Sequence, residues 1–242
     1  MNRLYKKSEI GFALLWIGLY VVLTSLADSA SASFGAIKSV TAALHIIMTA
    51  VLWAWIAKNG LKEKYGFCGL KQPAWRFLYF LPLAVIASSA LWSGAQLNWT
   101  GLETACYVVS MLCVGFLEEV IFRGLLFKAM AKENLKRAIV VSAVTFGLGH
   151  IVNLLHGQAL GETLLQIVFA VMVGFVLVII FHRGGSLIPC ILFHSVNNAL
   201  FAFAREGTLA PQTELTINVL LIVFGFGYLL ALLKLLPKRE GA

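Results

Sequence analysis

The sequence Gly115-Phe-Leu-Glu118-Glu119-Val-Ile-Phe-Arg123-Gly-Leu-Leu-Phe127 places two adjacent carboxylates and an arginine inside a long apolar stretch. Ionisable side chains cost free energy inside hydrocarbon, so each of them needs a polar partner or a functional role there. Glu119 and Arg123 are four residues apart, share one face of a helix and can form an ion pair. Glu118 lies about 100° around the helix from Glu119 and is left to face another helix. The stretch therefore predicts a membrane-spanning helix that carries a polar site.

The composition of the whole chain agrees with a membrane setting. Of the 242 residues, 60% are hydrophobic and 12% are charged, whereas soluble domains carry roughly 25% charged residues. The net charge of +8 would favour a nucleic-acid partner in a soluble protein. Here the basic residues lie in short connections between apolar runs, as topology signals do, so we expect a lipid bilayer and no nucleic acid as partner.

About eight apolar stretches approach the length of about 20 residues that a helix needs to cross a bilayer. The expected spans are residues 9–27, 36–57, 76–95, 104–126, 138–156, 162–181, 186–204 and 214–236. We predict an all-α, polytopic membrane protein of about eight transmembrane helices. Its polar residues predict an intramembrane cavity, which we expect to open towards the cytoplasm.

The basic residues predict the orientation of the chain. Seventeen of the 19 Lys and Arg residues, Arg239 among them, fall on one side of the expected spans, and only Lys38 and Arg205 fall on the other. By the positive-inside rule, both termini are expected to be cytoplasmic. The Ser and Ala residues at 29–33 predict an external loop, and the connection at 62–75, which mixes lysines with aromatic residues, predicts an interfacial segment.

Two further apolar stretches carry polar residues at one-turn spacing. These pairs are Phe146 with His150 and His194 with Asn198. Residues four apart lie on the same helix face, so each pair presents its polar groups together. A glutamate, two histidines and an asparagine that converge in a bundle can activate a water and stabilise an oxyanion. This is the chemistry of peptide hydrolysis.

Three patterns, Glu-Glu-x-x-x-Arg at 118–123, Phe-x-x-x-His at 146–150 and His-x-x-x-Asn at 194–198, resemble the CPBP family of intramembrane proteases. This family includes the type II CAAX prenyl endopeptidases and bacterial relatives, some of them called Abi or bacteriocin-immunity proteins. One such motif is weak evidence, but three in this order are specific. The resemblance covers residues 104–204, which we expect to form the catalytic core. We expect N-terminal transmembrane helices with the interfacial segment at 1–103 and a C-terminal transmembrane helix with a tail at 205–242.

The resemblance also implies roles for individual residues. These are activation of water by Glu118 and His150, binding of the oxyanion by His194 and Asn198, and a supporting role for Glu119 and Arg123. The implied substrate is a membrane-associated peptide or protein. The chain looks like a bacterial relative, so we expect a bacterial cell membrane as its location and do not expect prenylated substrates.

The question of a metal stays open at this point. Glu118, His150 and His194 are residue types that bind Zn²⁺, which lowers the pKa of its bound water to about 7. No HExxH sequence is present, and asparagine is a poor zinc ligand. The family has been described both as metalloproteases and as glutamate-dependent proteases. We favour the glutamate-dependent mechanism slightly, keep Zn²⁺ as the alternative and assign no cofactor.

Other chemistries and functions compete with this interpretation. Cys190 lies one turn before His194, and Gly184-Gly185-Ser186 superficially matches a rhomboid-like serine protease, but neither pattern explains Glu118. A non-proteolytic immunity or scaffold protein would keep the same fold and polar cavity. A proton-coupled transporter also uses intramembrane Glu and His, although the paired repeats typical of transporters are not evident.

Overall fold

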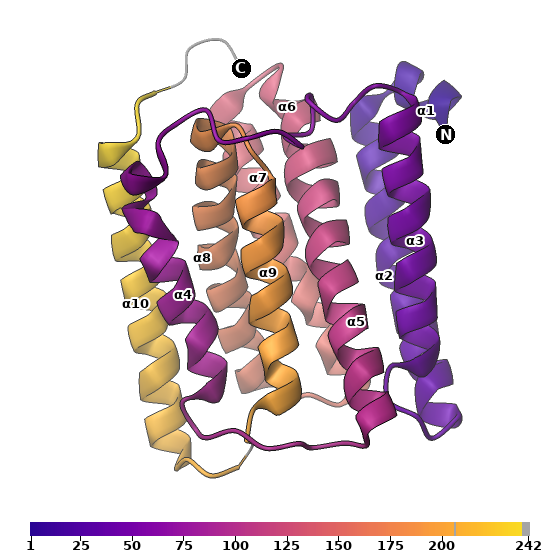
Figure 1. The fold of residues 1–242 in the computed structure, drawn as a ribbon, viewed down its shortest axis with the longest axis vertical. Helices are drawn as coiled ribbons and strands as arrows, with labels where there is room; N and C mark the ends of the chain where they lie inside the picture. Colours follow the sequence, from indigo (N-terminus) through magenta and orange to yellow (C-terminus); the bar gives the residue numbers. More distant parts are fainter. Residues whose placement is uncertain (206, 239–242) are drawn as a thin grey trace.

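A computed structural model describes residues 1–205 and 207–238, apart from the side chain of His156, as a bundle of roughly parallel and antiparallel helices (Figure 1). The α-helices are α1 (Asn2–Lys7), α2 (Glu9–Ser33), α3 (Ser39–Lys58), α4 (Leu81–Ser88), α5 (Gly101–Glu118), α6 (Lys128–Ala131), α7 (Leu135–Leu148), α8 (Leu160–Gly184), α9 (Ile188–Leu200) and α10 (Pro211–Leu235). Further helical segments have the tighter 3₁₀ turn or, in η3, the wider π turn. They are η1 (Ala74–Phe80), η2 (Ser89–Leu91), η3 (Glu119–Phe127), η4 (Gly149–His156) and η5 (Phe201–Phe203). The described residues form no strand, so the all-α prediction is confirmed.

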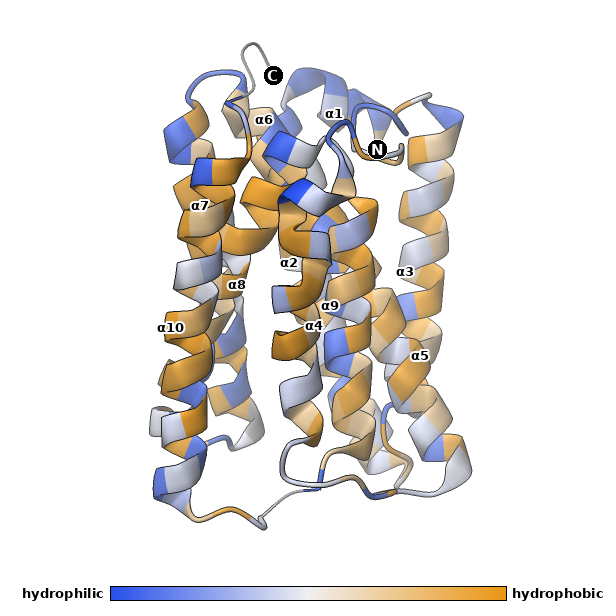
Figure 2. Ribbon diagram, turned by 60° about the vertical axis from the view of Figure 1, so that its left-hand side comes forward, coloured by the Kyte–Doolittle hydropathy of each residue, from blue (hydrophilic) through white to orange (hydrophobic). Residues whose placement is uncertain are grey.

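The membrane spans also agree with the prediction. Seven helical segments of the described chain are long and apolar enough to cross a membrane, and an eighth apolar helix, Ile188–Phe203, is shorter. The seven are Glu9–Ser33, Ser39–Lys58, Ala74–Leu91, Gly101–Ala131, Leu135–Leu155, Leu160–Gly184 and Pro211–Leu235. Figure 2 shows apolar residues along the middle of the helices and hydrophilic residues gathered at the two ends. The protein is therefore a polytopic membrane protein.

The first long helix is longer than expected. The predicted external loop at 29–33 is wrong, because α2 continues through Ser33. Within this helix the hydroxyl of Ser31 donates to the carbonyl of Ala27 at 2.9 Å, and that of Ser33 donates to Ser29 at 3.0 Å. A serine that bonds to the carbonyl four residues earlier satisfies its hydroxyl inside a helix. Serine-rich composition is therefore compatible with a helix here as well as with a loop.

The helix that begins as α5 changes its geometry at the polar site. It continues from Glu118 through η3, a π-helix of nine residues, into α6. All nine residues of η3 are buried, including Glu119 and Arg123. A π-helix has a wider turn than an α-helix and often marks a functional site. The regular helix expected over 104–126 is thus present as a longer span with a locally altered turn.

Glycines allow two pairs of helices to approach closely. A Cβ atom at Gly115 of α5 would lie 2.7 Å from the Cα of Ser195 on α9. A Cβ atom at Gly174 of α8 would lie 2.9 Å from the carbonyl oxygen of Ala143 on α7. Small residues permit such close packing between membrane helices. The approach at Gly115 places His194, the neighbour of Ser195, against the polar end of α5.

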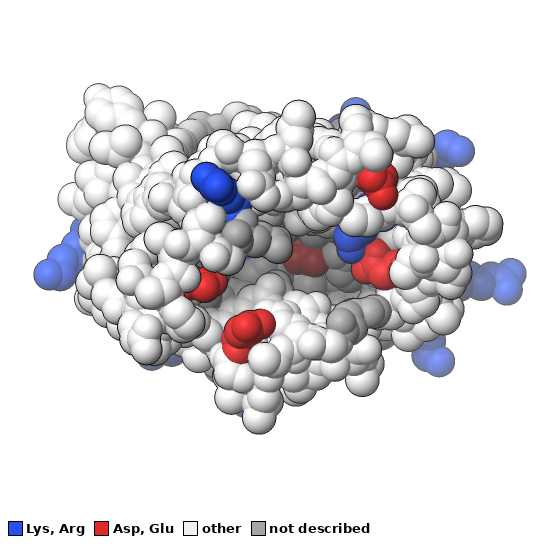
Figure 3. Space-filling view, turned by 90° about the horizontal axis from the view of Figure 1, so that it is seen from below, with Lys and Arg blue, Asp and Glu red and all other residues white. Residues whose placement is uncertain are grey.

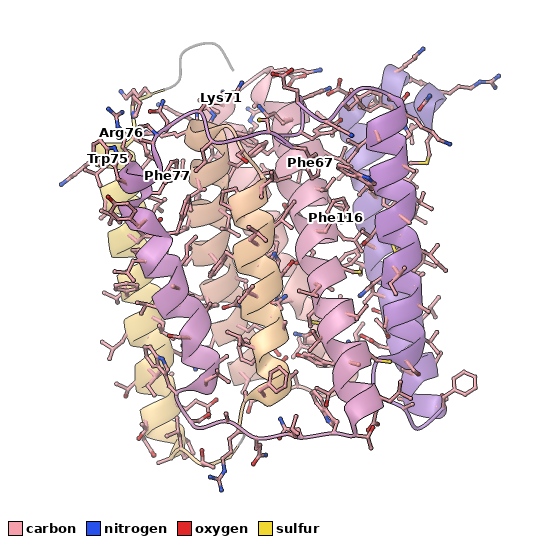
Figure 4. The ribbon with its side chains drawn as sticks, viewed as in Figure 1. Phe67, Lys71, Trp75, Arg76, Phe77 and Phe116 are labelled. Atoms are coloured by element: carbon pink, nitrogen blue, oxygen red, sulfur yellow. The ribbon has the colours of Figure 1, made fainter. Side chains whose placement is uncertain are left out.

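The chain between α3 and η1 crosses the end of the bundle that carries both termini (Figures 1 and 4). Phe67 points inwards and packs on Phe116 of α5, with the ring centroids 5.9 Å apart. Trp75 and Arg76 lie at the outer edge, with the guanidinium 5.4 Å from the indole centroid. Aromatic and basic side chains arranged in this way are typical of the headgroup region. Arg239, counted with the basic residues of this side, lies outside the described residues.

Candidate functional site

Glu119 and Arg123 form the ion pair that their spacing predicted. Arg123 Nη1 lies 2.9 Å from Glu119 Oε1, and both side chains are 0% exposed. Among the described residues, no acceptor meets the nitrogen atoms of this guanidinium with hydrogen-bond geometry. The guanidinium instead lies over the ring of Phe146, 4.1 Å from its centroid. A cation over an aromatic face is stabilised by the ring quadrupole, which supplements the ion pair.

His194 lies between the two adjacent carboxylates. Its Nδ1 atom is 2.9 Å from Glu119 Oε1, and its Nε2 atom is 3.6 Å from Glu118 Oε2. The first distance is a hydrogen bond and the second is longer than one. A carboxylate on one ring nitrogen fixes the orientation of an imidazole and leaves the other nitrogen for chemistry. The sequence did not predict the contact between Glu119 and His194.

Phe146 connects the three motifs. Its ring carries the Arg123 guanidinium on one face and meets two imidazoles at steep angles. The centroid of the His194 ring is 5.5 Å away at 87°, and that of the His150 ring is 5.8 Å away at 79°. Edge-to-face contacts of this kind fix the relative positions of rings. The phenylalanine of the Phe-x-x-x-His pattern therefore has a packing role at the centre of the site.

Glu118 has a partner that sequence reasoning missed. Tyr20 of α2 donates its phenolic hydrogen to Glu118 Oε1 at 2.6 Å. The sequence held a partial signal, because a buried tyrosine hydroxyl needs an acceptor and Glu118 needed an interhelical partner. Several helices carry polar residues, so the sequence did not identify Tyr20 among them.

A cavity of about 830 Å³ lies beside these residues. His150, His194 and Asn198 line it from η4 and α9, and apolar residues of α8 and α10 form its walls. On α9, Asn197 Nδ2 donates to Asn198 Oδ1 at 3.2 Å. The Asn198 oxygen accepts this bond, and the NH₂ group of Asn198 keeps its own two hydrogens to donate. Glu118 is not among the lining residues, but its Oε2 lies 3.6 Å from Nε2 of His194, which is one of them.

The mouth of the cavity lies at the opposite end of the bundle from the termini. Glu162 and Glu214 line it in the first turns of α8 and α10, at the bottom of Figure 1. Figure 3 shows this face hollowed, with carboxylate side chains around the hollow. The expected combination of a cavity open towards the cytoplasm with cytoplasmic termini is therefore wrong.

The packing explains which end is open. The first buried residue of α10 is Leu221, so the preceding residues of this helix leave room beside α8 and α9. At the other end, the amide of Lys71 donates to the carbonyl of Gly184 at 2.8 Å. The amide of Leu187 donates to the carbonyl of Gly66 at 2.8 Å. These bonds hold the connection after α3 across the ends of α8 and α9.

The residues suggested as zinc ligands do not form a three-ligand site in this arrangement. Within the described part of the chain, no three His, Cys, Asp or Glu side chains are placed to hold a metal ion. Both ring nitrogens of His194 face carboxylates, and Nδ1 of His150 is buried without a described hydrogen-bond partner. Zinc ligation by Glu118, His150 and His194 would require these side chains to rearrange.

The two competing nucleophiles have structural roles. The Sγ atom of Cys190 is buried and lies 3.4 Å from the carbonyl oxygen of Leu177. The hydroxyl of Ser186 donates to the carbonyl of Cys68 at 2.6 Å and accepts from the amide of Ile188 at 3.4 Å. Neither side chain has a general base within hydrogen-bond reach in these contacts.

Comparison with known proteins agrees with the motifs. Residues 100–200, which run from the start of α5 to the end of α9, match the family model of the Rce1-like type II CAAX prenyl endopeptidases. A search of the curated proteins and a search of the solved structures each find no match. The match covers residues 100–200 of the 242, and over this segment it confirms the resemblance stated from the motifs. The family is one of proteases, and this supports an enzymatic role.

Proposed function

We propose that this protein is an intramembrane endopeptidase that hydrolyses a peptide bond in a membrane-associated peptide or protein. The observation that carries the proposal is the convergence of His150, His194 and Asn198 on one cavity. Glu118 Oε2 approaches the same His194 ring at 3.6 Å. These side chains come from the segment that matches an endopeptidase family.

In the proposed mechanism, Glu118 and His150 activate a water that attacks the carbonyl carbon of the substrate. The Glu118 carboxylate takes a proton from this water and passes it to the leaving amine as the C–N bond breaks. His150 is half-buried and lines the cavity, and its unpartnered Nδ1 is suited to orient the water. The carbonyl oxygen acquires negative charge in this step and needs donors aimed at it.

Asn198 and His194 supply those donors in the proposal. The NH₂ group of Asn198 is directed by the bond that Asn197 makes to its oxygen. His194 Nδ1 lies 2.9 Å from Glu119 Oε1. An ionised carboxylate only accepts, so in the proposal Nδ1 carries the hydrogen of this bond. Nε2 then donates only when the ring is doubly protonated, so oxyanion binding by His194 requires the imidazolium form. Glu119 and Arg123 hold the ring in place.

We further propose that the protein lies in a bacterial cell membrane with both termini cytoplasmic. The count of basic residues supports this orientation through the positive-inside rule. The cavity mouth near Glu162 and Glu214 then faces the opposite side, and a substrate peptide reaches the site from there. The apolar walls of the cavity suit an apolar peptide segment.

The test is cleavage of apolar peptides reconstituted in liposomes with purified protein, followed by mass spectrometry. Glu118→Gln is the informative variant because Gln still accepts a hydrogen bond from Tyr20 but takes no proton from water. We expect its turnover to fall by about 10²–10⁴-fold with the midpoint of thermal unfolding nearly unchanged. Wild-type turnover in this variant would remove Glu118 as the base.

The same assay separates the remaining alternatives. Reversible loss of activity in a strong chelator, with about one equivalent of metal in the purified protein, would support the zinc mechanism. If the wild-type protein cleaves no peptide and its cellular phenotype survives a Glu118→Gln, Asn198→Ala double substitution, the protein is a binding or immunity factor. Cleavage that depends on Glu118 and persists in chelator is the result we expect.

A further inference from the structure

We propose that Tyr20 is a positioning residue for the Glu118 carboxylate, so that α2 supplies part of the active site. This helix lies outside residues 100–200, the segment that matches the protease family. The catalytic consequence of the inference rests on the proposed function of Glu118. The contact itself is independent of that function.

The contact between the two side chains is short and partly buried. The hydroxyl of Tyr20 donates to Glu118 Oε1 at 2.6 Å, and the tyrosine is 8% exposed. A distance of about 2.5–2.7 Å is typical of a hydroxyl that donates to an ionised oxygen. Such charge-assisted bonds are roughly twice as strong as neutral ones. The bond is therefore strong enough to select one orientation of the carboxylate.

The two oxygens of Glu118 have different surroundings. Oε1 accepts from Tyr20, whereas Oε2 faces Nε2 of His194 at 3.6 Å. The terminal torsion angle of a glutamate side chain has a broad distribution, so a carboxylate with no fixed partner samples many orientations. With Oε1 held by Tyr20, Oε2 stays directed at the imidazole and available to a reacting water. Misplacement of a catalytic group by about 1 Å can cost a factor of about 10² in rate.

Tyr20 is itself held by a polar network that the proposed mechanism does not use. Its ring stacks on the ring of buried His45 from α3, with centroids 5.8 Å apart and planes at 26°. Nδ1 of His45 lies 2.9 Å from the hydroxyl of Ser110 on α5, and Nε2 lies 3.0 Å from the hydroxyl of Thr24 on α2. Both nitrogens of the imidazole are thus partnered. A fully partnered buried network favours a single arrangement, so Tyr20 is a rigid support.

The most direct test of the proposal compares two tyrosine substitutions. Tyr20→Phe removes the hydroxyl and keeps the ring on His45. Tyr228→Phe is the matched control, because Tyr228 on α10 is 4% exposed and donates to the carbonyl of Phe77 at 3.1 Å, outside the site. In the liposome assay, we expect Tyr20→Phe to lower kcat by about 10–100-fold with KM within about twofold. Tyr228→Phe is expected to leave kcat within about twofold of wild type.

A structural role alone predicts a different result. If the Tyr20 hydroxyl only satisfies its own polarity, the two variants should lose similar amounts of stability and keep similar kcat values. Equal kcat values for Tyr20→Phe and the control would overturn the proposal. A change in KM without a change in kcat would also overturn it, because a misplaced base acts on the chemical step.

A second measurement does not depend on activity. The midpoint of thermal unfolding is measured for wild type, Tyr20→Phe, Glu118→Ala and the double variant. If Tyr20 holds Glu118, Tyr20→Phe lowers the midpoint more in the wild-type background than in Glu118→Ala. Additive shifts would overturn the contact. Should the wild-type protein cleave no peptide, the proposed function fails, and this cycle still decides whether Tyr20 positions Glu118.

Discussion

Arg123 is a buried cation whose environment is made by two side chains. Glu119 provides a carboxylate at 2.9 Å and Phe146 provides an aromatic face at 4.1 Å. Removal of one member of a buried pair leaves an uncompensated charge, which costs about 3–5 kcal/mol. We expect Arg123→Ala to lower the free energy of unfolding by about this amount and to lower the folded yield as well as the activity.

An exposed ion pair serves as the control for Arg123→Ala. Lys132 Nζ lies 2.7 Å from Glu9 Oε1, and its side chain is 58% exposed. Surface pairs contribute about 0–1 kcal/mol, so Lys132→Ala should change the free energy of unfolding little. Denaturation of both variants in the same detergent checks the prediction. A fully stable, folded Arg123→Ala protein would argue against the buried ion pair.

Asn198 is predicted to act on the chemical step. It lines the cavity, and its amide oxygen accepts a hydrogen bond from Asn197. Loss of one oxyanion donor typically lowers kcat by about 10²–10³-fold. Asn198→Ala should therefore show this loss with a nearly unchanged KM. Asn59→Ala, at the end of α3 away from the cavity, is the control and should keep wild-type kcat. A loss confined to KM would reassign Asn198 to substrate binding.

At the scale of elements, the contact between α5 and α9 determines whether His194 reaches the carboxylates. A side chain at Gly115 would meet the hydroxyl of Ser195 and lie 2.5 Å from its backbone nitrogen and 2.7 Å from its Cα. Because backbone atoms cannot rotate away, Gly115→Ala must push α9 from α5. We expect this variant to lose thermal stability and most of its activity.

A second glycine provides the matched control. Gly18 lies in the membrane helix α2, and a Cβ atom added there would meet no neighbouring group within 4 Å, so Gly18→Ala points into open space. We expect Gly18→Ala to keep the stability and activity of wild type, since alanine is at least as favourable in a helix. Equal stability of the two variants, measured by thermal unfolding, would show that the close approach of α5 and α9 is not required.

For the whole molecule, the proposed orientation predicts which positions face outwards. Cysteines introduced by Ser33→Cys, at the end of α2, and by Glu162→Cys, at the cavity mouth, should react with an impermeant thiol reagent in intact cells. Lys6→Cys, at the end with the termini, should react only after permeabilisation. The measurement is the increase in labelling over that of the parent protein, because the native Cys68, Cys106 and Cys113 are partly exposed. The reverse pattern would overturn the orientation and place the cavity mouth in the cytoplasm.

The sequence by itself determined the class of fold and the local chemistry. Apolar runs of membrane length predict helices because hydrocarbon offers no partner to an unpaired backbone group. Spacing of four residues on one helix was enough to predict the pair of Glu119 with Arg123. The three motifs were enough to indicate the protease family. These features depend on residues close together in the chain, where helix geometry fixes their relation.

Only the tertiary structure decided how the motifs meet. It placed His194 between two carboxylates, assigned Tyr20 to Glu118 and set the cavity mouth at the end away from the termini. Tyr20 and Glu118 are 98 positions apart, and several arrangements of apolar helices satisfy the same hydropathy pattern. Lipid-facing and protein-facing surfaces are both apolar in a membrane, so the sequence pattern does not state which faces touch. Close packing at glycines such as Gly115 determines which helix faces touch.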